Sequence, residues 1–170
     1  IKLNASGEHN IYNALAAYVA SKLAGAKNIA PALATFENVK RRMESYGKFK
    51  GANIIHDYAH HPTEIESAIA SVRHSVKNKL YVVFEPHTYT RTEKLWDKFK
   101  TCFSLADETI MLPVYAAREE GIEGITSEKL SQEILKCIYI NSYADAFCYI
   151  NNTITKDDTV LILGAGTIEK

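Results

Sequence analysis

The sequence lacks the features of several protein classes. No apolar run in its 170 residues approaches the length of a membrane span, and the N-terminus IKLNASGEHN has no signal-peptide pattern. Lys plus Arg and Asp plus Glu number 20 each, so no net basic field exists for nucleic acid or an anionic membrane surface. We therefore expect neither nucleic acid nor a membrane among the partners.

Cysteine is scarce, and its spacing suggests no disulfide or metal-binding pair. The three cysteines, Cys102, Cys137 and Cys148, form no CxxC motif and fall within helical patterns. This is typical of reduced thiols in a protein core, and it predicts a cytoplasmic protein. Together with a resemblance to a bacterial enzyme family, it predicts that the protein is bacterial. The chain also begins without Met, so we expect a fragment of a longer protein.

Glycine motifs for phosphate binding are missing too. No GxxxxGK[ST] pattern occurs, and GAGTIEK at 164–170 has Glu169 where GxGxxG needs its third glycine. We interpret the GAG segment as a tight turn that leads from a strand towards a helix. No phosphate cradle for ATP is therefore expected within this chain.

What the sequence does contain is an alternation of strands and helices. Helical spacing predicts helices over 10–24 and 29–36. Extended runs and helical patterns then alternate along the chain, with strands at 46–50, 52–56, 79–84, 107–112 and 159–163 and helices at 62–76, 92–105, 126–137 and 143–153. This order predicts an α/β fold with a Rossmann-like, mostly parallel sheet, helices on both faces and a short helical segment in front. We place the boundary between 1–43 and 44–170.

The stretch ANIIHDYAHHPTEI at 52–65 combines a strand, a polar turn and the start of a helix. Pro62 and Glu64 both suit a first helical turn. Ligands of open α/β sheets bind outside the carboxyl ends of the strands. The polar residues expected there are Asp57, Tyr58, His60 and His61.

A second polar turn follows the apolar strand KLYVVF, because Pro86 stops the strand pairing. This turn presents His87 and Arg91, and the arginine fork matches a carboxylate or a phosphate. Thr92 is expected to cap the next helix. The two strands are consecutive, so we expect them to be neighbours whose polar ends share one crevice. The long irregular segment 113–125 is also a candidate functional loop.

Metal binding is a weaker interpretation of the histidines. Adjacent histidines rarely bind one ion together, and neither HExxH nor a Cys/His spacing is present, so we expect no metal site. The DYAHH string still leaves open a DHH-like metal phosphoesterase, and a non-catalytic binding module is a further alternative. His56 and His74 are expected to be structural.

Six segments in order resemble the Mur ligase family: GEHNIYNALAA, FxxxKRR at 36–42, DYAHHPTEI, FEPHTYTRT, VYAAREEGIEGITSEKL and LGAGTI. The resemblance implies that 1–43 is the helical tail of a central ATP-binding domain and that 44–170 is the C-terminal, amino-acid-binding domain. It also implies that the P-loop and most Mg²⁺ ligands lie upstream, so that this fragment alone is inactive.

The same resemblance implies roles for individual residues. Those implied near ATP are His9, Asn10, Asn13, Arg42 and Asp57. Those implied near the amino acid and the acyl substrate are Tyr58, His60, His87 and Arg91. Asp57, His60 and Arg91 are the implied catalytic residues. Many relatives have Arg where this chain has Thr88, which removes one expected contact with a carboxylate.

The implied reaction is ATP-driven amide formation on UDP-N-acetylmuramate, with L-alanine as the amine, in peptidoglycan synthesis. The substrate carboxylate attacks the γ-phosphate, the amine attacks the resulting acyl phosphate, and phosphate leaves. An alternative within the family is the recycling ligase that joins a tripeptide to the same UDP-sugar.

Overall fold

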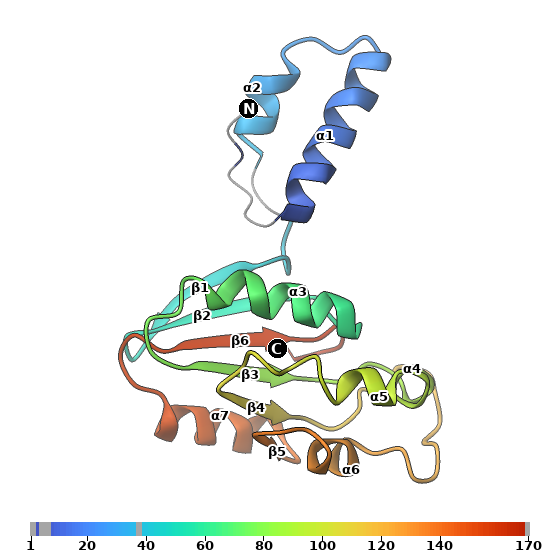
Figure 1. Cartoon of the computed structure of the whole chain (residues 1–170), viewed down its shortest axis with the longest axis vertical. Helices are drawn as coiled ribbons and strands as arrows, with labels where there is room; N and C mark the ends of the chain where they lie inside the picture. The colour runs from blue at the N-terminus through green and yellow to red at the C-terminus, as the bar shows by residue number, and fades with distance from the viewer. Residues whose placement is uncertain (1–2, 4–7, 37–38, 169–170) are drawn as a thin grey trace. The chain divides into compact units, whose positions relative to one another are not determined.

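The computed structural model describes residues 3, 8–36 and 39–168. It divides into two compact units, Ile1–Met43 and Glu44–Lys170 (Figure 1). The first unit holds helices α1 (Glu8–Leu23) and α2 (Ile29–Ala34). None of the helices in the described part of the chain is long and apolar enough to cross a membrane.

Most of the large apolar side chains of α1 are exposed, while Tyr18 is half-buried. Their exposed fractions run from 47% to 85%, for Ile11, Tyr12, Leu15, Val19 and Leu23. Helical spacing predicted the helix, but within the described residues its contact with α2 buries only part of the apolar side.

The second unit is built on a six-stranded sheet in the order β1-β2-β6-β3-β4-β5. Its strands are β1 (Glu44–Phe49), β2 (Ala52–Asp57), β3 (Leu80–Phe84), β4 (Glu108–Met111), β5 (Cys137–Tyr139) and β6 (Thr159–Leu163). The β1–β2 pair is an antiparallel hairpin and the other pairs are parallel. The prediction of a mostly parallel sheet is confirmed.

Two predictions from the sequence are wrong: one concerns which strands are neighbours, and the other concerns where a helix ends. β2 and β3 are not neighbours, because β6 lies between them and pairs with both. The predicted helix 126–137 ends early, since α6 covers Ser127–Gln132 and the chain then forms β5. Short apolar runs fit a helix or a strand equally well, and here pairing with β4 decides for the strand.

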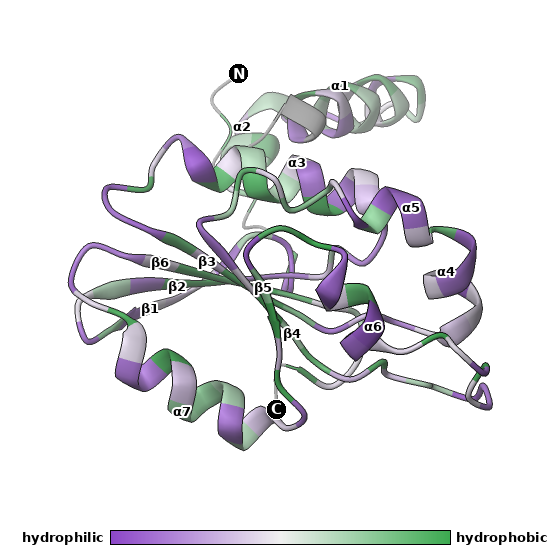
Figure 2. Cartoon of the chain, turned by 60° about the horizontal axis from the view of Figure 1, so that its bottom comes forward, coloured by the Kyte–Doolittle hydropathy of each residue, from purple (hydrophilic) through white to green (hydrophobic). Residues whose placement is uncertain are grey.

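Helices cover both faces of the sheet, as predicted. Figure 2 shows α3 (Pro62–Arg73) and α5 (Trp96–Phe99) on one face and α7 (Tyr143–Thr153) on the other. The predicted helix 92–105 is two shorter helices, α4 (Tyr89–Lys94) and α5, which are separated at Leu95. Thr92 lies inside α4 and its hydroxyl donates to the Thr88 carbonyl oxygen at 2.8 Å, so the prediction that it caps the helix is wrong.

The core lies on both sides of β3, whose residues are all buried. On the α3 and α5 side, Phe84 packs against Phe99 and Phe103 with ring centroids 5.7 and 5.2 Å apart. On the α7 side, Tyr81 and Val83 belong to an apolar cluster with residues of α7. An apolar cavity of about 580 Å³ remains between α7 and the sheet.

The cysteines differ in burial. Cys102 is buried, Cys137 is half-buried and Cys148 is exposed on α7. The prediction of core thiols therefore fails for Cys148, which lies on the outward side of its helix. His56 is buried in β2 beside the ring of Tyr46, in keeping with a structural role.

Candidate functional site

The candidate site lies where β2 and β3 end. Asp57 and Phe84 both pair with Leu163 of β6, so the two strands end at the same level. Three residues after each strand end come His60 and His87, whose ring centroids are 5.9 Å apart. The two turns thus lie beside each other although their strands are not neighbours, because both turns continue past the end of β6.

The β2–α3 turn is held by its own residues. The buried Asp57 carboxylate accepts a hydrogen bond from the Ala59 N–H at 2.8 Å. His61 is the N-cap of α3, and its Nδ1 accepts from the Thr63 N–H at 3.3 Å. The Glu64 carboxylate accepts from the N–H groups of His60 and His61 at 3.2 and 3.3 Å. With Pro62 in the first turn, this is a complete capping box, and the predicted helix start is confirmed.

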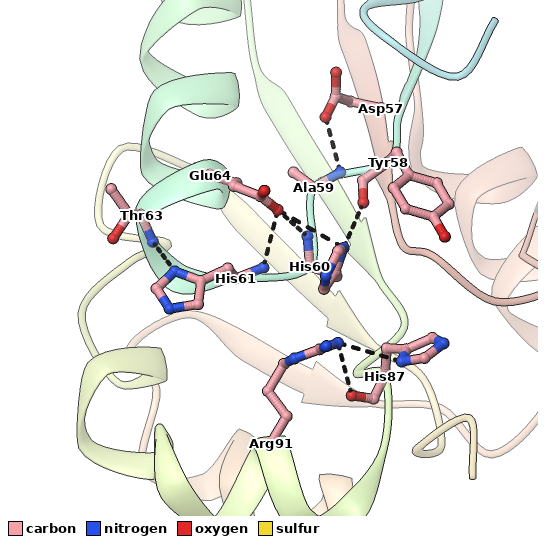
Figure 3. Close-up of polar contacts among 9 residues, drawn as sticks. All are labelled: Asp57, Tyr58, Ala59, His60, His61, Thr63, Glu64, His87 and Arg91. Atoms are coloured by element: carbon pink, nitrogen blue, oxygen red, sulfur yellow. Dashed lines mark hydrogen bonds and ion pairs between the residues drawn. The ribbon is translucent and has the colours of Figure 1, made fainter. Parts of the chain in front are cut away.

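His60 has a defined tautomer in this turn. Its Nδ1 lies 3.0 Å from the Tyr58 carbonyl oxygen. Because a carbonyl oxygen can only accept, Nδ1 carries a proton, and in the neutral ring the lone pair is on Nε2. The Tyr58 ring packs edge-on against His60 at 5.5 Å between centroids. His60 therefore offers a hydrogen-bond acceptor from this turn (Figure 3).

His87, from the β3–α4 turn, and Arg91, from α4, lie beside His60, as Figure 3 shows. Arg91 Nη1 lies 3.2 Å from His87 Nδ1 and 3.3 Å from the His87 carbonyl oxygen. A guanidinium only donates, so Nδ1 of His87 accepts and the proton is on Nε2. Burial lowers the pKa of His87, and the positive charge of Arg91 and the nearby His60 lower this pKa further. The site thus combines a cation, a ring N–H donor and a ring acceptor.

The segment 113–125 runs alongside this turn. The Thr88 N–H donates to the Tyr115 carbonyl oxygen at 2.9 Å, and the Tyr115 N–H donates to the Pro86 carbonyl oxygen at 2.8 Å. The Tyr115 ring lies 5.5 Å from that of His87. Further along, Glu119 accepts hydrogen bonds from Thr90. Sequence reasoning marked this loop as functional but missed Tyr115 and Glu119, because nothing local links them to His87.

Comparison with known proteins identifies the family. Residues 41–166 match the Mur ligase, glutamate ligase domain family. The chain belongs to the Mur ligase family. The resemblance noted in the sequence is thereby confirmed.

Two curated relatives are both UDP-N-acetylmuramate–L-alanine ligases. The protein from Caldicellulosiruptor bescii is 44% identical over 177 residues, which cover 100% of this chain and 39% of the relative. The protein from Clostridium beijerinckii is 40% identical over 174 residues, which cover 99% of this chain and 38% of the relative. The chain therefore spans well under half the length of these relatives.

Solved structures show the same fold. A UDP-N-acetylmuramate–alanine ligase from Thermotoga maritima matches with a TM-score of 0.78 and 23% identity, over 98% of this chain and 36% of that chain. A pseudomurein peptide ligase type C from Methanothermus fervidus gives 0.76 and 26%, over 99% and 36%. A murein peptide ligase from Psychrobacter arcticus gives 0.72 and 24%, over 99% and 36%.

In this Mur ligase chain, the turn after β6 that contains Gly166 packs against Glu85 and Tyr115. Glu85 is buried, and its carboxylate accepts hydrogen bonds from the Tyr143 hydroxyl and, at 3.1 Å, from the Thr167 N–H. A Cβ on Gly166 would overlap this carboxylate and come within 2.7 Å of the Tyr115 ring. Glycine at 166 is thus required by packing, in line with a tight turn. Residues 164–168 form bends and a turn, so no helix begins within them.

The residues implied near ATP belong to both units of the Mur ligase chain. Asn10 and Asn13 lie on α1, where the Asn13 side-chain amide donates to Asn10 Oδ1 at 3.5 Å, and Arg42 is exposed. His9 lies on α1, but its side chain is outside the described residues. These residues are in the first unit and Asp57 is in the second, so their shared nucleotide role stays a prediction.

Among the described residues, no group of three or more His, Cys, Asp or Glu side chains is arranged to hold a metal ion. Membership of the Mur ligase family favours the ligase interpretation over the metal phosphoesterase.

Proposed function

We propose that this chain is the C-terminal part of an ATP-dependent ligase that adds L-alanine to UDP-N-acetylmuramate in bacterial peptidoglycan synthesis. The observation that carries the proposal is the convergence of Tyr58, His60, His87 and Arg91 at one edge of the sheet. Family membership and the L-alanine ligases among the curated relatives support it.

The polar groups of the site match the two ends of an amino acid. The Arg91 guanidinium and the Nε2–H of His87 can both donate to a carboxylate, and a planar cation is the best partner for that group. The Nε2 lone pair of His60 can accept a hydrogen bond from the amine, or take its proton as the amine becomes a nucleophile. The neutral state of His87, which its lowered pKa favours, leaves Arg91 as the cation for the carboxylate.

In the proposed reaction, the substrate carboxylate becomes an acyl phosphate, and the amine of L-alanine displaces phosphate from it. The contribution of this chain is to orient the amine and to exclude water from the acyl phosphate. The upstream part of the longer enzyme would hold Mg²⁺ and most of the ATP, whose γ-phosphoryl group activates the carboxylate. We assign contacts with the nucleotide to His9, Asn10, Asn13, Arg42 and Asp57.

The test uses the full-length parent protein. Phosphate release is measured with Mg-ATP and UDP-N-acetylmuramate, with either L-alanine or the murein tripeptide as the amine. Release that depends on L-alanine is the expected result, and the 170-residue chain alone should give no turnover. Release with the tripeptide alone would assign the protein to recycling, and release with neither amine would end the proposal.

A further inference from the structure

The start of α4 does not cap itself. Thr88 occupies the N-cap position with φ of 70° and makes no side-chain hydrogen bond to the helix. A positive φ is unfavourable for a β-branched residue, and the first N–H groups of a helix need acceptors. Because α4 has six residues, it has little hydrogen bonding of its own to hold that geometry.

Glu119 supplies the missing acceptor from the loop 113–125. One carboxylate oxygen accepts from the Thr90 N–H at 2.9 Å, and the other accepts from the Thr90 hydroxyl at 2.5 Å. The hydroxyl of Thr90, its N–H and further groups at the start of α4 lower the pKa of Glu119. The carboxylate is therefore ionised near neutral pH, which suits the N-terminus of a helix.

The residue that Glu119 holds is next to the site. Arg91 follows Thr90 directly, and its guanidinium turns back onto His87. On the other side of His87, the backbone of Tyr115 bonds to Pro86 and Thr88. The loop therefore contacts the chain before and after His87 and immediately before Arg91.

We propose that Glu119 is a positioning residue of the amino-acid site, whose carboxylate fixes the start of α4 and thereby the orientation of Arg91 and His87. The inference deepens the proposed function and rests on it. Without the carboxylate, the strained N-cap can relax and Arg91 moves with it. A displacement of about 1 Å at a positioning group can cost on the order of 100-fold in rate.

The first test is kinetic, in the full-length parent. Glu119→Ala should raise KM for L-alanine about tenfold while KM for ATP changes less than about twofold, since the lost hydrogen bonds act on the amino-acid site alone. Glu119→Gln should have a smaller effect, because its amide oxygen still accepts one hydrogen bond. Glu120→Ala is the matched control: Glu120 is the next residue and is exposed, so KM should stay at the wild-type value. An unchanged KM in Glu119→Ala, or an equal rise in Glu120→Ala, would overturn the inference.

A double-mutant cycle isolates the contact itself. Thr90→Val removes the hydroxyl partner of Glu119, so the effects of Thr90→Val and Glu119→Ala on KM for L-alanine should not add. Fully additive effects would show that Glu119 acts by another route.

A second readout separates this inference from the proposed function. In the 170-residue chain, Glu119→Ala should speed amide hydrogen exchange at Thr90 and shift the ring signals of His87, while Glu120→Ala should do neither. If these changes occur but the parent shows no L-alanine-dependent phosphate release, the contact stands and the proposed function fails. If the parent is active but Thr90 exchange and the KM are unaffected, the inference fails and the proposed function stands.

Discussion

The two turns that form the candidate site are held in different ways. In the β2–α3 turn, the side chains of Asp57, His61 and Glu64 accept hydrogen bonds from N–H groups no more than four positions away. In the β3–α4 turn, Glu119 reaches Thr90 across 29 positions of sequence, and Tyr115 pairs with His87. The side-chain hydrogen bonds that hold the first turn are thus local, whereas those that hold the second come from a distant loop. Changes to the loop should disturb the second turn alone.

The largest expected effect compares one residue from each strand end, Arg91 after β3 and Asp57 at the end of β2, by the substrate that each one binds. Arg91→Ala should raise KM for L-alanine in the parent enzyme about 100-fold with little change for ATP, because a charge-assisted pair with the carboxylate is lost. Asp57→Asn should instead weaken ATP use. Kinetics with each substrate varied in turn measure both effects.

Arg118→Ala is the matched control, since Arg118 lies in the loop and is exposed. An unchanged KM for L-alanine in Arg91→Ala would remove the role of Arg91 as the partner of the alanine carboxylate.

The next largest expected effect is a loss of stability, from a substitution that disturbs the packing around the second turn. Gly166→Ala places a methyl group against the Glu85 carboxylate and the Tyr115 ring. Such overpacking should cost about 2 kcal/mol in the free energy of unfolding, which lowers Tm by roughly 4–8 °C for a chain of this size. Thermal unfolding followed by circular dichroism measures the change.

Gly121→Ala provides the control, because a Cβ there meets its nearest atom at 3.9 Å, in the Tyr89 ring. NMR signals of His87 should shift in Gly166→Ala and those of His61 should not. Wild-type Tm in Gly166→Ala would contradict the packing requirement.

A smaller loss of stability is expected from a substitution that removes hydrogen bonds of the first turn and leaves the second turn unchanged. Glu64→Ala removes the acceptor shared by His60 and His61 and should cost about 1 kcal/mol of stability, as loss of a capping interaction usually does. Urea unfolding of the chain measures it. Glu66→Ala, at an exposed position of the same helix, should leave the midpoint unchanged. Equal losses in both variants would mean that the capping box contributes nothing measurable.

The smallest expected effect is the dependence of stability on pH that His87 of the second turn produces. Burial and Arg91 lower the pKa of His87 below its ordinary value of 6.5, so the unfolded chain binds the proton first as pH falls. His87 therefore contributes stability that is present above pH 6.5 and is lost as pH falls from there towards its folded-state pKa. The midpoint of the His87 ring signals in an NMR titration should lie below 6.5.

His87→Gln should flatten the dependence of stability on pH in that window. A midpoint at or above 6.5, or an unchanged slope, would contradict the depressed pKa.

Prediction from the sequence succeeded where structure depends on neighbours in the chain. The start of α3 at Pro62 followed from its capping residues, and the mostly parallel sheet followed from the order of strands and helices. The residues Tyr58, His60, His87 and Arg91 were expected together from the two strand ends, and the structure brings them together. Their roles towards substrates stay predictions.

Prediction failed where pairing across the fold decides. The segment beginning at Cys137 becomes a strand because β4 pairs with it, and β6, the last strand in the sequence, lies between β2 and β3. The exposure of Cys148 depends on which side of α7 faces the sheet. In each case the local sequence is compatible with more than one outcome.

The sequence by itself determined the α/β class, the capped turn that carries His60, and membership of the Mur ligase family, because these are encoded by short-range patterns. Tertiary structure alone decided the strand order and the support of the second turn by Tyr115 and Glu119. The physical reason is that a hydrogen bond between residues 29 positions apart forms only after the sheet has placed the two segments side by side, and no local propensity specifies that placement.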